Sequence, residues 1–264
     1  MQDHGHSHHS GGLSKVPLVT LAFWVIKICA TTLGETGGDA LSMTLKLGYA
    51  ISTAIFFGIF IVAVAGQVRA SSHHPFLYWA VIVATTTVGT TMSDYLTRTA
   101  GLGYLKSSLL LFAVLLGILA VWYFTLGSVS VNQITSRKAE SFYWTAILFS
   151  NTLGTALGDC LADTSGLGYE GSALVFAGGL ALIAAAYLWT DVSHTALFWM
   201  AFILTRPLGA TLGDLLTKPV ANGGLNLSRI TSSLIIAAFI IVAILFTSRK
   251  VGGIPGADDG SDLI

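Results

Sequence analysis

Charged residues are scarce in this chain of 264 residues, since only 10% are Asp, Glu, Lys or Arg whereas 53% are hydrophobic. A soluble globular domain carries about 25% charged residues, so the composition excludes that class. The formal net charge is zero and no basic cluster occurs, so nothing supports nucleic-acid binding. The two cysteines, Cys29 and Cys160, fall in apolar stretches and are expected to pack as small hydrophobic side chains.

Catalytic signatures are also missing. The sequence has no HExxH, no GxSxG and no phosphate-binding loop of the GxxxxGK type, and no histidine falls in an expected membrane span. We therefore predict neither an enzyme nor a bound cofactor.

Apolar stretches of about 20 residues recur along the chain, the length that a helix needs to cross a hydrocarbon core of ~30 Å. The connections are short, so no soluble domain is inserted, and backbone polar groups in lipid are satisfied within helices. The sequence predicts an all-α, polytopic membrane bundle of eight transmembrane helices. The expected spans are residues 17–38, 47–68, 76–97, 105–127, 141–161, 171–190, 195–216 and 230–247.

Four tryptophans mark an internal repeat, because each precedes a glycine by ten residues and an aspartate by fifteen, and a second glycine follows the aspartate by nine. Such self-similarity is typical of a repeat architecture. The tryptophans are Trp24, Trp79, Trp144 and Trp199; the first glycines Gly34, Gly89, Gly154 and Gly209; the aspartates Asp39, Asp94, Asp159 and Asp214; and the second glycines Gly48, Gly103, Gly168 and Gly223.

The repeats divide the chain into residues 15–69, 70–134, 135–190 and 191–250, between a His-rich tail (1–14) and an acidic, glycine-rich tail (251–264) that we expect to be disordered. Each repeat holds two helices, so every copy enters the membrane from the same side. We therefore expect a parallel arrangement with a pseudo-two-fold axis along the membrane normal. Small residues four positions after each first glycine predict that the tryptophan-bearing helices pack at the centre and the others face lipid.

The pattern W-x9-G-x4-D, repeated over about residues 15–247, resembles a bacterial family of integral membrane proteins with four tandem two-helix repeats of unknown function. The resemblance implies a multi-pass protein of the bacterial inner membrane and leaves its chemistry open. The fourth copy departs from the others, with Pro207 in place of threonine and Gly224 in place of tyrosine. A distinct role for the last repeat is therefore expected.

Basic residues between the spans and at their ends predict that both termini are cytoplasmic. The side with the termini carries one more of them than the opposite side. The two sets are Lys15, Arg69, Arg137, Lys138, Arg249 and Lys250 against Lys46, Arg98, Lys106, Lys218 and Arg229.

Acidic residues within the spans or at their edges are the main candidates for function. With each tryptophan at the membrane interface, the motif aspartate lies ~22 Å deeper. Repeats one and three carry a second acid at helical spacing, and such pairs repel unless a proton or cation neutralises them. We expect the two pairs to face each other across the two-fold axis as a cation-binding site formed by Glu35, Asp39, Asp159 and Asp163.

Basic residues near the motif are candidates for gating or proton coupling. Asp94 has Arg98 one turn later, and Asp214 has Lys218. Two further cations fall inside the spans: Lys27, expected to snorkel outward or to pair, and Arg206, expected to pair with an internal acid such as Glu35.

Threonines share a helical face with the aspartates and form a polar ladder that either coordinates cations or joins helices by hydrogen bonds. They are Thr32, Thr36, Thr87, Thr91, Thr152 and Thr211. The N-terminal His4, His6, His8 and His9 are a candidate site for a transition metal, and short histidine tracts also arise from cloning.

These features favour a transporter or exporter of a small cation, with membrane lipid and that cation as partners. Oxygen ligands favour a divalent metal such as Mn²⁺, and proton coupling is compatible with the carboxylates. Two alternatives stay open: a carrier of a small organic metabolite, and a non-transporting scaffold or sensor whose buried ion pairs are structural.

Overall fold

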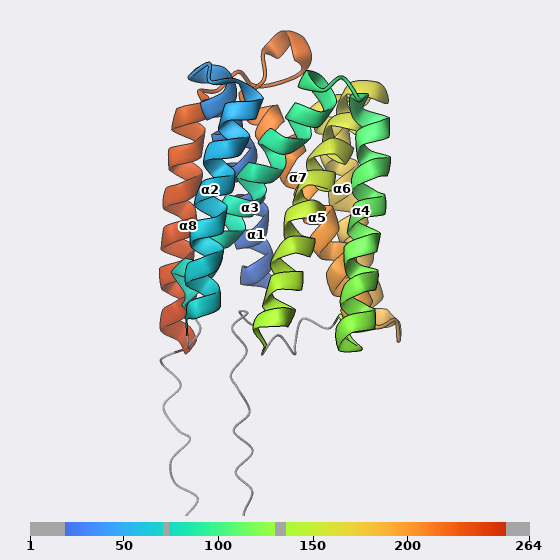
Figure 1. Ribbon diagram of the computed structural model, residues 1–264. Coiled ribbons are helices and arrows are strands. Elements are labelled where there is room, and N and C mark those ends of the chain that lie inside the picture. The colour runs from blue at the N-terminus through green and yellow to red at the C-terminus, as the bar shows by residue number, and fades with distance from the viewer. Residues whose placement is uncertain (1–18, 71–73, 130–135, 252–264) are drawn as a thin grey trace, which may run out of the picture.

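The computed structural model describes residues 19–70, 74–129 and 136–251 (Figure 1), and these residues form helices and no strand. Two π-helical segments, η1 (Ala40–Thr44) and η2 (Tyr95–Thr99), follow the first and third α-helices, and a 3-10 turn, η4 (Val220–Asn222), follows the seventh. The α-helices are α1 (Leu21–Asp39), α2 (Gly48–Arg69), α3 (Pro75–Asp94), α4 (Gly103–Leu126), α5 (Arg137–Thr164), α6 (Gly168–Trp189), α7 (His194–Thr217) and α8 (Arg229–Val251).

The four tryptophan-bearing helices form a closed inner ring, as the small residues of the motif predict. Helix α1 packs against α3 and α7, and α5 packs against the same two helices from the opposite side. The even-numbered helices lie outside: α2 against α3, α4 against α5, α6 against α7 and α8 against α1. Each outer helix therefore packs mainly against the inner helix of the next repeat, and α8 closes the circle onto the first (Figure 1).

The outer helices expose mostly apolar side chains. Examples are Leu109 in α4, Leu182 in α6 and Leu234 in α8, each more than 60% exposed. Within the described residues, six helices are long and apolar enough to cross a membrane: α2, α3 with η2, α4, α6, α7 and α8.

Helices α1 and α5, also expected to be spans, do not belong to this apolar group. They are the inner helices with the most charged residues, among them Lys27 and Glu35 in α1 and Glu140 and Asp159 in α5. These four side chains are buried against neighbouring helices, so the two helices bury polar groups within the protein.

Aromatic side chains close the ring near the N-terminal ends of the inner helices. The residue before each tryptophan packs against the tryptophan of the next repeat, and the fourth repeat packs against the first. The ring centroids are 5.4 Å apart for Phe23–Trp79, 5.7 Å for Tyr78–Trp144, 6.3 Å for Tyr143–Trp199 and 5.7 Å for Phe198–Trp24.

Trp79, Trp144 and Trp199, which are expected at the depth of the membrane interface, are buried between helices. The apolar outer helices lie around the inner ring, and these inner tryptophans pack against aromatic side chains of the preceding repeat.

The motif glycines allow the inner helices to approach closely. Each one contacts the residue that lies three positions before the glycine of the next repeat: Gly34 contacts Thr86, Gly89 contacts Asn151, Gly154 contacts Arg206 and Gly209 contacts Thr31. Because the same contact occurs at all four junctions of the ring, each inner helix packs against the next one through the same positions.

We expect Gly154→Ala to lower the free energy of unfolding by about 1–3 kcal/mol, the usual cost of overpacking. The new methyl group would lie 2.5 Å from Cβ of Arg206 and 3.0 Å from Cδ of Pro207. Unfolding in SDS titrations measures the loss.

Gly37→Ala in α1 is the matched control, because a methyl group there meets no atom within 4 Å. Alanine also favours a helix over glycine by about 0.5–1 kcal/mol, so this variant should be as stable as the parent or more stable. Equal losses in the two variants would contradict the close packing at Gly154.

Candidate functional site

Five buried carboxylates gather near the C-terminal ends of the inner helices. They come from all four repeats: Glu35 and Asp39 in α1, Asp94 in α3, Asp159 in α5 and Asp214 in α7, each at most 3% exposed. We call these five residues the acid cluster. They meet because each motif aspartate occupies the same position on its helix and the four helices form a ring.

Glu35 lies at the middle of the acid cluster. One carboxylate oxygen from each of Glu35, Asp159 and Asp214 lies within 4.8 Å of the others, and the same holds for Glu35, Asp39 and Asp94. Either triad could supply oxygen ligands to a metal ion. Because α1 and α5 are opposite in the ring, the approach of Glu35 and Asp159 agrees with the expected meeting of repeats one and three.

Two basic side chains bridge aspartates of successive repeats. Nζ of Lys218 lies 3.1 Å from Oδ1 of Asp214 and 2.9 Å from Oδ2 of Asp39. Lys218 follows the last residue of α7, and the connection to α8 folds back over it, with the backbone N–H of Asn226 donating to the Lys218 carbonyl at 2.9 Å. This contact fixes the main chain at Lys218, and the side chain extends from there to both carboxylates.

Arg98 forms the second bridge. Its Nε lies 3.1 Å from Oδ1 of Asp94 and its Nη2 lies 3.5 Å from Oδ2 of Asp159. The side chain sits in η2, and π-helical turns of this kind occur often at functional sites. Arg229, which sequence reasoning did not single out, adds a contact of 3.5 Å to Asp39 from the first residue of α8.

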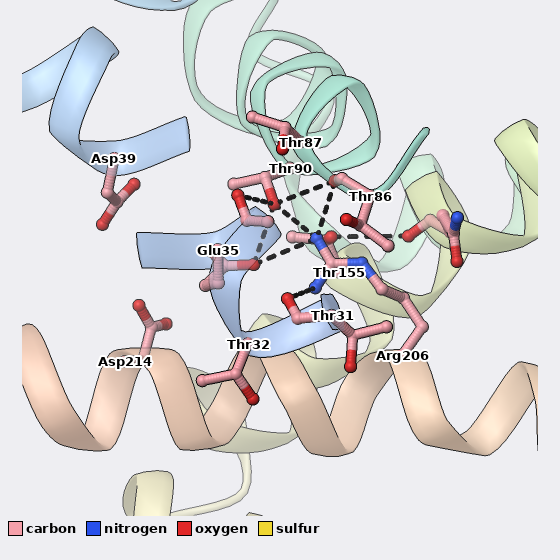
Figure 2. Close-up of polar contacts among 12 residues, drawn as sticks. Thr31, Thr32, Glu35, Asp39, Thr86, Thr87, Thr90, Thr155, Arg206 and Asp214 are labelled. Atoms are coloured by element: carbon pink, nitrogen blue, oxygen red, sulfur yellow. Dashed lines mark hydrogen bonds and ion pairs between the residues drawn. The ribbon is translucent and has the colours of Figure 1, made fainter. Parts of the chain in front are cut away.

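Arg206 reaches from α7 across the ring to α1 and α3 and is fully buried (Figure 2). Its Nη2 donates to Oε2 of Glu35 at 3.1 Å and also to the Thr90 hydroxyl, which in turn donates to the same carboxylate oxygen at 3.0 Å. Arg206 thus forms the ion pair with an internal acid that the sequence suggested.

Lys27 behaves differently from either expectation. It is fully buried, so it does not snorkel outward, and its contacts in the described part of the chain include no carboxylate. Nζ lies 3.5 Å from Oδ1 of Asn151 and 4.1 Å from the centre of the Phe202 ring. The reason is that Lys27 lies on the buried face of α1, which packs against other inner helices, so the lysine does not reach the exterior.

Asp163 does not join the acid cluster, contrary to the expected quartet. It is exposed near the end of α5, one turn beyond Asp159. Tyr104 donates to Oδ2 of Asp163 at 2.6 Å, and Tyr169 to Oδ1 at 3.4 Å. Asp94 and Asp214, predicted as gating residues, are the cluster members that the quartet lacked.

The predicted threonine ladder bonds mainly to its own helices. The hydroxyls of Thr32, Thr36, Thr87, Thr91, Thr152 and Thr211 donate to carbonyls three or four residues earlier. Thr36 also accepts a hydrogen bond of 2.8 Å from Ser233 in α8, so this face points toward an outer helix. The threonine that donates to a cluster acid is instead Thr90, and Thr31 and Thr86 contact Arg206 through their carbonyls. Sequence reasoning missed all three.

A positional comparison of the repeats could have found them. The residue three before each motif glycine is Thr31, Thr86, Asn151 or Arg206, and the residue one after it is Glu35, Thr90, Thr155 or Ala210. Arg206 and Glu35 thus stand at positions where the other repeats have uncharged residues. The candidate metal ligands His4, His6, His8 and His9 and the two predicted tails fall outside the described residues, apart from Val251 at the end of α8.

Comparisons with known proteins agree with the fourfold organisation. No curated protein and no solved structure matches the sequence. The family described as Repeat of Unknown Function (DUF347) matches it four times, at residues 22–72, 77–128, 142–193 and 197–251. These ranges correspond to the four repeats marked by the tryptophans, and the chain belongs to the DUF347 repeat family.

Proposed function

We propose that this protein crosses a bacterial inner membrane with all eight helices and transports a small cation through the inner ring. The observation that carries the proposal is the acid cluster, in which carboxylates from all four repeats converge at the centre of a ring with an apolar exterior. Ionisable residues inside a membrane are costly and commonly mark an ion pathway. With both termini in the cytoplasm, the acid cluster lies toward the periplasmic end of the ring.

Ligand chemistry favours a hard or borderline divalent metal such as Mn²⁺ or Mg²⁺. The groups that meet at the two triads are carboxylate oxygens, which suit such ions, and neither Cys29 nor Cys160 belongs to them. Among the described residues, the five carboxylates contact four basic side chains: Arg98, Arg206, Lys218 and Arg229. One negative charge is therefore left for a proton, and metal binding would release that proton and displace a basic side chain.

Lys218 and Arg98 fit the role of gates in this scheme. Each bridges the aspartates of two successive repeats, so its withdrawal frees two carboxylates for the metal at once. Arg98 is the more accessible of the two, with 32% of its side chain exposed.

Flux measurements in proteoliposomes test the proposal. The parent chain should carry Mn²⁺ inward with a counterflow of protons, and the Glu35→Gln, Asp159→Asn double variant should fall to the level of protein-free vesicles. Asp163→Asn is the matched control, because this acid lies outside the acid cluster, and its flux should equal that of the parent. Absence of cation flux in the folded parent would overturn the proposal.

A structural role is the second candidate, because every acid of the cluster has a basic partner: Glu35–Arg206, Asp39–Lys218, Asp94–Arg98, Asp159–Arg98 and Asp214–Lys218. Buried ion pairs of this kind can fix how helices assemble without binding a ligand. This role predicts a protein that folds and carries no flux in the same assay.

A further inference from the structure

The charge of Arg206 is peculiar to the fourth repeat. The equivalent residues of the other repeats are Thr31, Thr86 and Asn151, all neutral, and each of the four packs against the motif glycine of the preceding repeat. Three repeats therefore place a neutral side chain at this position, and the fourth places a guanidinium there.

Oxygen atoms surround that guanidinium (Figure 2). Besides Oε2 of Glu35 at 3.1 Å, it contacts the main-chain carbonyl of Thr86 at 3.2 Å, the carbonyl of Thr31 at 3.4 Å and the hydroxyl of Thr90. One carboxylate, two main-chain carbonyls and one hydroxyl are the kind of ligands that membrane proteins use for small alkali cations.

The fit of arginine to this set is incomplete. Its Nε is buried and has no hydrogen-bond partner. An unpaired buried donor is costly, whereas a spherical cation needs only acceptors and would leave no such donor. The guanidinium carries one positive charge, so a monovalent ion replaces it without changing the charge of the core.

Helix α7 is weakened at this residue. Pro207 lies inside the helix and has no N–H, so the carbonyl of Ile203 loses its helical hydrogen bond. Prolines in this position commonly bend a helix. A bend at Pro207 would move the adjacent Arg206 relative to the oxygens of α1 and α3.

We propose that Arg206 is a tethered occupant of a monovalent-cation site formed by Glu35, Thr31, Thr86 and Thr90, and that Na⁺ or K⁺ binds there when the arginine is absent. The site differs from the carboxylate triads in its ligands, although Glu35 belongs to both. The inference rests on the proposed function only in that transport would bring the ion to this site. Binding of the ion can be measured without transport.

Arg206→Thr, which installs the residue of repeats one and two, tests the proposal. The full chain is purified in detergent with Na⁺, K⁺, thallium(I) or choline as the cation, and binding and thermal unfolding are measured. We expect one saturable site per chain for a small cation and a higher Tm in that salt than in choline. Arg206→Lys keeps a tethered charge and should show neither effect.

Glu35→Gln combined with Arg206→Thr removes the only carboxylate of the proposed site and should abolish both the binding and the rise in Tm. A folded Arg206→Thr variant that binds no small cation would overturn the proposal. So would a variant that is unfolded in every one of these salts, because the ion is proposed to replace the charge of the arginine. The two proposals can fail separately. If the parent shows no Mn²⁺ flux but the Arg206→Thr variant binds Na⁺, the proposed transport is wrong and the monovalent-cation site is supported.

Discussion

Replacement of Glu35 by Gln is expected to lower the free energy of unfolding by about 3–5 kcal/mol, the range found when one partner of a buried ion pair is removed. Arg206 is fully buried and lies 3.1 Å from the Glu35 carboxylate, so the variant leaves its charge without a counter-charge. Loss of the glutamate also relieves repulsion from nearby aspartates, but the direct contact with Arg206 is the shorter one and should dominate. Unfolding in SDS titrations measures the loss.

A double-mutant cycle separates the pair from its surroundings. The Glu35→Gln, Arg206→Thr double variant removes both charges and should recover most of the stability, because no uncompensated charge remains in that layer. The coupling free energy between Glu35 and Arg206 should then account for most of the stability lost in Glu35→Gln alone. Additive losses in the double variant would show that Arg206 is neutralised by some other group.

Sequence spacing alone predicted the repeats, the eight helices and the inner position of the tryptophan-bearing helices. These features depend on apolar length and on small residues at fixed offsets, which are local properties. The packing of α8 against α1 and of each outer helix against the next repeat could not be predicted, since it depends on how the ring closes. The same closure decides which acids meet.

The candidate site shows this limit most clearly. Helical spacing predicts that Asp163 is a partner of Asp159. In the structure Asp163 lies one turn closer to the end of α5, where it is exposed and accepts a hydrogen bond from Tyr104. The sequence pairs Asp94 with Arg98 and Asp214 with Lys218, each within one repeat. The structure adds that Arg98 and Lys218 each contact a second aspartate from another repeat. The residue spacing within one repeat cannot predict contacts between two repeats.

Thr90 shows that an alignment of the four repeats predicts contacts between them. It occupies the position that Glu35 occupies in repeat one, and in the ring the two side chains meet at 3.0 Å. These two equivalent positions of repeats one and two thus touch each other. Alignment of the copies predicts contacts that helical periodicity alone cannot.

Lys218→Met is expected to cost about 3–5 kcal/mol of unfolding free energy, because it leaves Asp39 and Asp214 buried without the cation that bridges them. The exposed Lys106 in α4 provides the control, and Lys106→Met should change stability by no more than about 0.5 kcal/mol. Arg98→Met should cost less than Lys218→Met, since 32% of the Arg98 side chain is exposed and water can solvate the remaining charges.

The deficit of Lys218→Met should shrink as the pH is lowered. A proton on Asp214 supplies the positive charge that the lysine provided, and the folded variant gains more from that proton than the unfolded chain, whose carboxylates are solvated. Stability of the variant relative to the parent should therefore rise toward acidic pH and fall as the pH increases. A deficit that stays constant with pH would show that Lys218 contributes through packing of its aliphatic chain, and that the two aspartates do not depend on it for their charge balance.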